Sequence, residues 1–145
     1  MPKFNRWWVL KPAVFLACLV PMAWLAWDAY NGHLSANPIE DITHTTGDWT
    51  LRFLMITLGA TPLARITGWK FPLRFRRMAG LFAFFHGFLH LTTYVWLDQF
   101  FAFGGMLADV AKRPFITAGF TGFVLMIPLA ITSTKKWIRR LGFKR

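Results

Sequence analysis

Long apolar stretches separated by short polar segments dominate the chain. A helix needs about 20 mainly apolar residues to cross the roughly 30 Å hydrocarbon core of a bilayer. Four stretches approach that length, and we expect membrane-spanning helices at about residues 8–27, 51–67, 78–97 and 115–133. The pattern predicts an all-α integral membrane protein with four transmembrane helices in a single membrane domain, residues 1–145.

The charged residues between these stretches indicate an orientation. Lys and Arg cluster before the first stretch, between the second and third, and after the fourth. The 6 acidic residues all fall in the two other connections. Cytoplasmic loops of membrane proteins carry an excess of Lys and Arg. We therefore place both termini and the loop between the second and third helices in the cytoplasm.

Composition agrees with a membrane protein and narrows the partners. The chain is 55% hydrophobic and only 16% charged, whereas a soluble domain is about 25% charged. Its net charge of +11 comes from short clusters between apolar blocks, which favours contact with anionic lipid over nucleic acid. Cys18 is the only cysteine, which excludes a disulfide framework and a cysteine-based metal site; we expect it to be a packing residue.

Two histidines lie inside the third apolar stretch and carry the candidate chemistry. His86 and His90 are four residues apart, so they share one helix face. A neutral imidazole in an apolar setting is a good ligand for haem iron, and we take His90 as the candidate metal ligand. Two histidines on one helix cannot bind one iron from opposite faces of a porphyrin. A hydrogen bond across a helix interface is the alternative, and it is favoured for His86. An i, i+4 histidine pair can also bind zinc, but Gly87 stands where the HEXXH signature has Glu.

Other candidate binding residues lie outside the apolar stretches. Arg76 and Arg77 precede the third stretch and could bind propionate or phosphate groups. Their role as cytoplasmic topogenic charge explains them equally well. His33 and His44 belong to the first outer connection, where a solvated or capping role is the simple interpretation. We accept it for His33 and keep His44 as a candidate cofactor-binding residue.

Three stretches resemble one protein family. Residues 36–69, 72–98 and 116–142 resemble the MsrQ family, also called YedZ, and include the motif H-x-T-G-x-W and the segment FLHLTTY. Members are the haem-binding membrane subunits of bacterial protein-methionine-sulfoxide reductase systems. They belong to the wider ferric-reductase-like transmembrane group.

The resemblance implies a function, a set of partners and a location. It implies a six-helix cytochrome with haem b in the bacterial inner membrane, with FMN as a further candidate cofactor. Electrons would come from the quinone pool or a cytosolic flavin reductase. They would pass to a periplasmic molybdenum-cofactor subunit that repairs methionine sulfoxide. By position, His90 matches the haem-ligand histidine of the family. His44 matches a family position without an assigned role, and the resemblance gives no ligand role to His86.

The family pattern continues beyond the segment that this chain resembles. Its next segments, W-x-x-L-H-R-L and a helix ending in V-L-H, supply the opposing haem ligands. We therefore expect a C-terminally truncated member, a partial ferric-reductase-like bundle. If His90 binds iron, the opposing ligand would come from His44, from His86 of a second chain, or from a partner. The first hypothesis is an electron-transfer subunit with no catalytic site of its own on the substrate. The alternative is an apo, non-redox membrane fragment that packs against a partner. A transporter is a weaker third option, because no acidic residue lies inside the apolar stretches.

Overall fold

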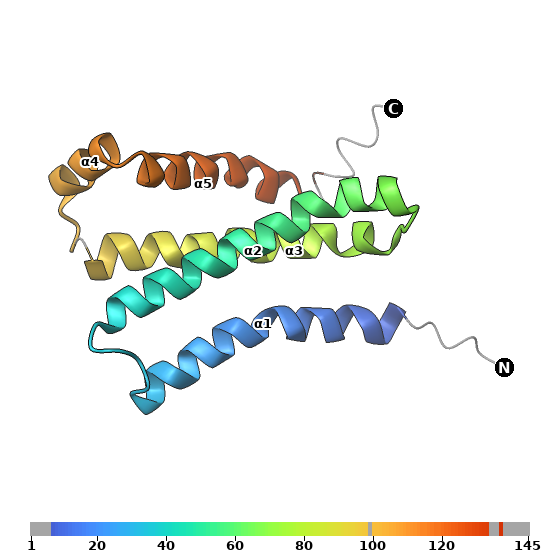
Figure 1. The fold of residues 1–145 in the computed structure, drawn as a ribbon, viewed down its shortest axis with the longest axis horizontal. Coiled ribbons are helices and arrows are strands. Elements are labelled where there is room, and N and C mark those ends of the chain that lie inside the picture. Colours follow the sequence, from blue (N-terminus) through green and yellow to red (C-terminus); the bar gives the residue numbers. More distant parts are fainter. Residues whose placement is uncertain (1–6, 99, 134–136, 138–145) are drawn as a thin grey trace.

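The computed structural model describes residues 7–98, 100–133 and 137, and within them every regular element is helical. The elements, in chain order, are α1 (Trp7–Asn31), α2 (Pro38–Thr67), α3 (Phe71–Thr93), the π-helical turn η1 (Tyr94–Asp98), α4 (Phe103–Lys112) and α5 (Pro114–Thr132). Figure 1 shows α2 and α3 between α1 and α5. The contact between α2 and α3 is the most extensive, and α3 also contacts α1 and α5. The all-α fold expected from the sequence is confirmed.

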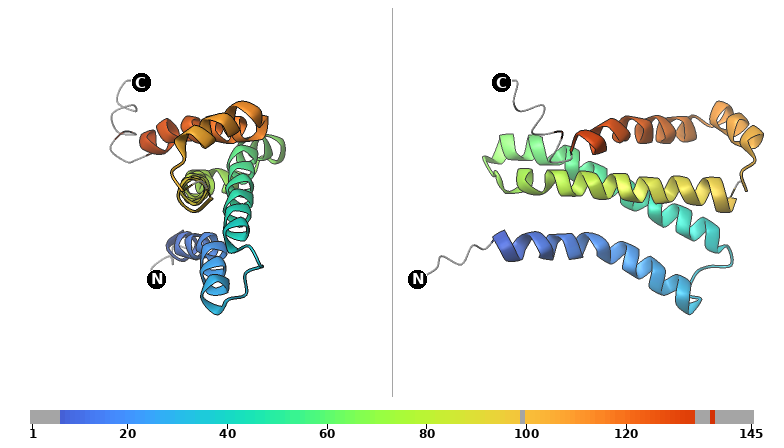
Figure 2. Two further views of the ribbon diagram at one scale, coloured as in Figure 1. Left: turned by 90° about the vertical axis from the view of Figure 1, so that its left-hand side faces the viewer. Right: turned by 180° about the vertical axis from the view of Figure 1, so that it is seen from behind.

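Among the described residues, three segments are long and apolar enough to cross a membrane: Val9–Asn31, Phe71–Leu97 and Pro114–Thr132. They overlap the first, third and fourth expected crossings almost completely. The second expected crossing lies in α2, which is long enough but too polar to meet the same measure. Nevertheless α2 runs alongside α3 through the bundle (Figures 1 and 2). Its packing, and not its hydropathy, favours a fourth crossing, which stays a prediction.

The start of α2 differs from the sequence expectation. The helix begins at Pro38 and not near Leu51, so it includes the polar H-x-T-G-x-W region. Proline fits the first turn because its missing N–H would have no helical partner there. Glu40 and Asp41 also lie in the first turn, where carboxylates complement the positive end of the helix dipole. A search for apolar stretches overlooks such a polar helical turn. At the other end, Gly68 adopts φ 70° and terminates the helix, a conformation that glycine adopts at little cost.

The third helix also starts earlier than expected. It begins at Phe71 and not at Met78, again with a proline, Pro72, in its first turn. A short helix, α4, joins η1 to α5 and was not expected from the sequence. The last helix agrees with the expected range to within one residue at each end.

Aromatic side chains of three helices form the buried core. Phe53 of α2 stacks on Phe82 of α3, with ring centroids 5.7 Å apart. The ring centroid of Phe15 in α1 lies 5.3 Å from that of Phe82, and Ala83 is fully buried. Partly buried residues around this cluster are Cys18, Leu19, Trp49, Leu54, Met78 and Met126. The core therefore fixes α2 and α3 against each other at mid-length.

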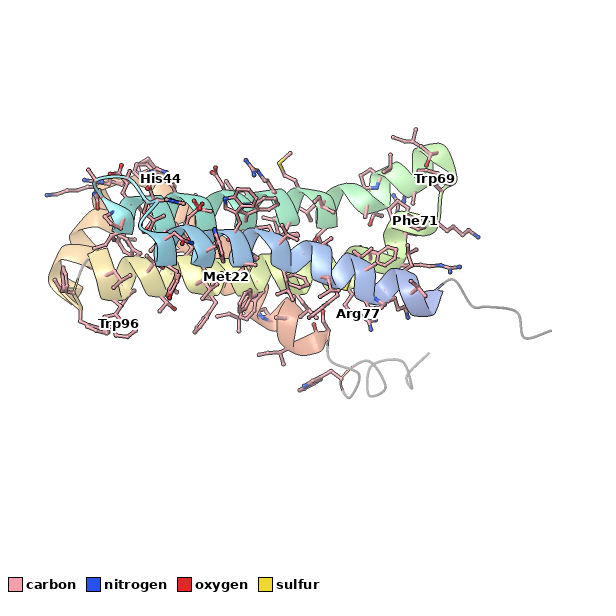
Figure 3. All side chains as sticks on the ribbon, turned by 90° about the horizontal axis from the view of Figure 1, so that it is seen from below. Met22, His44, Trp69, Phe71, Arg77 and Trp96 are labelled. Atoms are coloured by element: carbon pink, nitrogen blue, oxygen red, sulfur yellow. The ribbon has the colours of Figure 1, made fainter. Side chains whose placement is uncertain are left out.

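The bundle separates the two kinds of connection. The start of α1, the α2–α3 turn and the end of α5 lie at one end in Figure 1, and the α1–α2 connection and α4 lie at the other. Figure 3 shows Trp69, Phe71 and Arg77 toward the first end and His44 and Trp96 at the second. This is the arrangement that the predicted orientation requires. Which end faces the cytoplasm stays a prediction.

Candidate functional site

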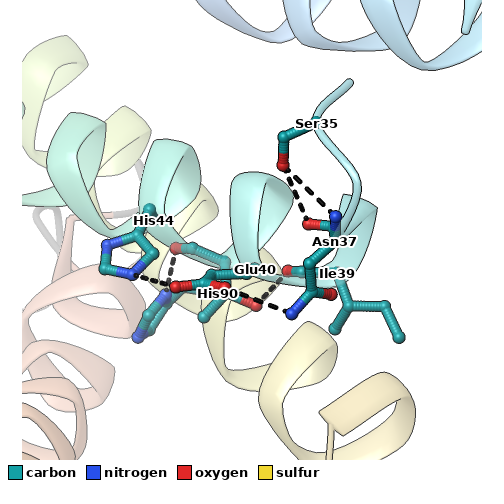
Figure 4. Close-up of polar contacts among 7 residues, drawn as sticks. Ser35, Asn37, Ile39, Glu40, His44 and His90 are labelled. Atoms are coloured by element: carbon teal, nitrogen blue, oxygen red, sulfur yellow. Dashed lines mark hydrogen bonds and ion pairs between the residues drawn. The ribbon is translucent and has the colours of Figure 1, made fainter. Parts of the chain in front are cut away.

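His90 makes a hydrogen bond that crosses from α3 to α2. Its Nδ1 lies 2.9 Å from the backbone oxygen of Thr43 (Figure 4). A carbonyl oxygen can only accept a hydrogen bond, so Nδ1 carries the proton in this arrangement. In the neutral ring Nε2 then keeps its lone pair. Protein metal sites commonly hold a ligating imidazole in this way, through a hydrogen bond to its second nitrogen.

The Thr43 carbonyl receives a second donor. The hydroxyl of Thr46 donates to the oxygens of Ile42, at 2.7 Å, and Thr43, at 3.1 Å. Thr46 is only 2% exposed, so its polar group is satisfied inside the helix packing. The hydroxyl has one proton and its shorter contact is to Ile42, so its interaction with the Thr43 oxygen is the weaker of the two.

His86 lies one turn earlier on α3 in a different environment. It is 2% exposed, and its Nδ1 donates to the oxygen of Phe82 in its own helix at 3.0 Å. Its Nε2 is buried without a hydrogen-bond partner in the part of the chain that the structure describes. The ring packs between Phe53, at a centroid distance of 5.2 Å, and Phe85, at 5.6 Å and nearly perpendicular. The interhelical hydrogen bond favoured for His86 is thus replaced by a bond within its own helix.

The two outer histidines make only exposed contacts. His44 lies on α2 with its Nε2 3.8 Å from Glu40 Oε1, and its side chain is 76% exposed. His33 Nδ1 lies 3.8 Å from Asp28 Oδ1 in the α1–α2 connection. Exposed ion pairs of this kind contribute little to stability. His33 therefore fits the solvated role expected for it, and His44, a candidate binding residue, is likewise exposed to solvent.

The arginines expected near a cofactor lie at the other end of α3. Arg76 and Arg77 are exposed in its first two turns. At about 1.5 Å per residue, Arg77 lies roughly 20 Å along the helix axis from His90. The structure therefore does not bring Arg76, Arg77 and His90 into one site.

Sequence reasoning did not identify a cavity at the His44 end of the bundle. It has a volume of about 500 Å³ and lies between α1, the following connection and α2. Its wall includes Trp24, Leu25, Asp28, Asp41 and Trp49. Apolar walls with a few polar groups are typical of small-molecule pockets. The residues that line this cavity come from separate parts of the chain, so no local sequence pattern marks it.

The described residues partly fit a haem. They supply one imidazole, His90, whose free Nε2 has the chemistry of an axial ligand. His86 is on the same helix, and its Nε2 lies within the aromatic core. Within residues 7–98, 100–133 and 137 no three His, Cys, Asp or Glu side chains gather as ligands for a metal ion.

Comparison with known proteins identifies relatives over most of the chain. A relative from Herminiimonas arsenicoxydans is 56% identical over 137 residues, which cover 94% of this chain and 63% of the relative. Relatives from Rhodospirillum rubrum and Caulobacter vibrioides are 53% and 51% identical, over 92% and 89% of this chain and 64% and 61% of their own lengths. Each is named protein-methionine-sulfoxide reductase heme-binding subunit MsrQ. The resemblance found in the sequence is thus confirmed.

The chain spans a little under two thirds of the length of these relatives. No solved structure matches it. The family model described as ferric reductase like transmembrane component matches residues 46–145. This match covers more than half of the chain and includes α3 and its two histidines. The chain therefore belongs to the ferric-reductase-like transmembrane family.

Proposed function

We propose that this chain is the haem-binding part of a membrane electron-transfer subunit and that His90 is an axial ligand. The hydrogen bond from His90 Nδ1 to the Thr43 oxygen carries this proposal, because it leaves Nε2 free to bind iron. The names of the relatives support it. A bound haem b would supply reversible one-electron chemistry at its iron. The protein forms and breaks no bond in the substrate.

The chain's own residues have three tasks in this mechanism. His90 binds, and the Thr43 carbonyl orients its ring and sets its tautomer. The Phe53 and Phe82 stack keeps α2 and α3 in register, so the carbonyl and the imidazole stay within hydrogen-bonding distance.

The second axial ligand belongs, in this proposal, to a segment outside the described residues. The relatives are longer than this chain, and such a segment could be part of the same polypeptide or of another chain. The electron donor is quinol or a flavin reductase carrying FMN. The acceptor is a periplasmic molybdenum-cofactor subunit that reduces methionine sulfoxide. The location is the bacterial inner membrane, with the basic helix ends in the cytoplasm.

One observation favours the alternative function. The described residues provide only one suitable axial ligand, and a b-type haem in a membrane bundle is usually held by two. Without a second ligand the chain would be an apo, non-redox fragment that packs against a partner. The electron-transfer function predicts a haem absorbance spectrum for this chain, and the alternative function predicts none.

The test is a reduced-minus-oxidised absorbance spectrum of the detergent-solubilised 145-residue chain. We expect a b-type spectrum that disappears in His90→Ala and persists in His33→Ala, the control at an exposed histidine. A spectrum that survives in His90→Ala would overturn the ligand assignment. Absence of haem from the unmodified chain would favour the apo alternative.

A further inference from the structure

The imidazole of His90 lies directly against a glycine of α2. A Cβ atom added at Gly47 would stand 3.2 Å from both Nδ1 and Cε1 of His90. Such a distance is shorter than ordinary carbon–nitrogen van der Waals contacts, so the ring would have to move by a few tenths of an ångström. Gly47 follows Thr43 by four residues, and the two positions therefore share one face of α2. That face offers the ring both a carbonyl acceptor and room to lie against the backbone.

The other glycine inside α2 shows that this contact is specific. A Cβ at Gly59 would meet nothing within 4 Å. A Cβ at Gly80, across the interface in α3, would meet a methyl group of Thr57 at 3.4 Å, an ordinary distance. A glycine within a helix is unfavourable compared with alanine. At Gly47 the absence of a side chain leaves room for the His90 ring, whereas at Gly59 no neighbouring group fills the corresponding space.

We infer that Gly47 is a positioning residue that, together with the Thr43 carbonyl, holds His90 as the Nδ1–H tautomer with Nε2 directed away from α2. The identity of the metal centre rests on the proposed function, but the tautomer and its cause do not. With alanine at position 47, the displaced ring loses the 2.9 Å hydrogen bond or keeps it at a longer distance. Hydrogen bonds weaken as the distance between donor and acceptor grows, so the Nε2–H tautomer becomes populated.

The tautomer can be measured without any haem. The chain is labelled with ¹⁵N-histidine, and the imidazole nitrogens are observed by NMR in detergent, with His90→Ala identifying the resonances of His90. We expect only the Nδ1–H form of His90 in the unmodified chain. In Gly47→Ala we expect Nε2–H resonances of His90 to appear. Gly59→Ala is the control in the same helix, and Gly80→Ala is the control at the same interface; both should keep the unmodified pattern.

Three results would overturn the inference. They are an Nε2–H form in the unmodified chain, an unchanged His90 pattern in Gly47→Ala, and an equal change in Gly80→Ala. If Gly47→Ala does not fold, the double variant Gly47→Ala with His90→Ala shows whether the His90 ring is the cause. Recovery of the helical circular dichroism in the double variant means that the imidazole is the group in conflict. No recovery means that Gly47 serves the packing of α2 for another reason.

A second readout separates this inference from the proposed function. If the chain holds haem, Gly47→Ala should raise its midpoint potential, because a weaker Nδ1–H bond makes the imidazole a poorer donor to ferric iron. Gly59→Ala should leave the potential unchanged. If haem is lost in His90→Ala but the His90 tautomer is unchanged in Gly47→Ala, only the positioning role of Gly47 is contradicted. If the expected tautomers are found but the chain binds no haem, only the proposed function is contradicted.

Discussion

His86 and His90 lie one turn apart on α3, and the regions around them are opposite in character. His90 is half-buried, its Nδ1–H reaches the Thr43 carbonyl of α2, and its Nε2 has no hydrogen-bond partner among the described residues. His86 is enclosed by the rings of Phe53 and Phe85, and its Nδ1 donates a hydrogen bond within its own helix. Two identical side chains on one helix face thus receive different chemistry from their neighbours.

The difference shows what a metal-binding histidine needs in a membrane bundle. An oriented ring and a free lone pair are not sufficient, because His86 has both. The lone pair must also open onto a region where a cofactor can approach. The aromatic packing around His86 leaves no such approach, whereas His90 lies nearer the end of the helix and is only partly covered.

The largest effect that would test this comparison concerns haem content. His90→Phe should lose the haem absorbance entirely, whereas His86→Phe should keep it at nearly the level of the unmodified chain. Both variants place a ring of similar size on the same helix face, so they differ only in which of the two imidazoles is removed. Absorbance per mole of purified protein measures the outcome. Equal loss in both variants would mean that the two environments are not functionally distinct.

The next effect concerns stability at His86. A buried polar group without a partner costs about 1–3 kcal/mol, and the Nε2 of His86 is such a group. His86→Phe should therefore raise the free energy of unfolding by about 1 kcal/mol. His86→Ala should lower it by about 2–4 kcal/mol, because it leaves a cavity between aromatic rings. Unfolding by a denaturing detergent, followed by circular dichroism, measures both; a destabilised His86→Phe would indicate an unseen partner of Nε2.

A smaller effect distinguishes the two glycines of α2. Gly59→Ala should stabilise the helix by about 0.5–1 kcal/mol, since alanine is the better helix former and nothing occupies the added methyl position. Gly47→Ala should gain less or lose stability, because the methyl group meets the His90 ring. The same unfolding assay compares them. If both variants gain equally, the ring at His90 moves freely and is not held against α2.

The smallest effect lies at the start of the helix that carries Thr43. The Ser35 backbone N–H donates to Asp41 Oδ2 at 2.6 Å and holds the pKa of that carboxyl below its usual range. Because the pKa of Asp41 is lower in the folded chain, its hydrogen bond contributes fully to stability at pH values above the pKa that Asp41 has in the unfolded chain. It is lost as the pH falls through the lower, folded pKa. The protection of the Ser35 amide against hydrogen exchange, relative to an unstructured peptide at the same pH, should therefore fall in that acidic window.

Asp41→Asn provides the control for this acid effect. It should show faster exchange of the Ser35 amide already at neutral pH, with little further change on acidification. The His90 hydrogen bond to Thr43 should be unaffected in Asp41→Asn, because it lies inside α2 and does not depend on the α1–α2 connection. A change at His90 on that substitution would show that the outer connection also positions the ligand.

The sequence predicted the crossings best where one physical property decides the structure. Val9–Asn31, Phe71–Leu97 and Pro114–Thr132 each contain a long, mainly apolar stretch, and its length alone indicates that they can span a bilayer. It predicted the beginning of α2 wrongly, because that turn is polar and is made helical by Pro38 and its acidic first turn. Hydropathy measures the partition of a segment into lipid and does not measure where a helix starts.

The sequence by itself determined an all-α membrane fold, the separation of basic and acidic connections, and a histidine pair with His90 as its candidate ligand. Only the tertiary structure decided how the two histidines differ. The partner of His90 is a backbone oxygen 47 residues away, and every residue type carries the same carbonyl, so no sequence pattern marks it. The role of Gly47 likewise depends on how α2 and α3 are rotated about their axes. Packing of the Phe53 and Phe82 rings sets that rotation, and it acts between segments that are distant in the chain.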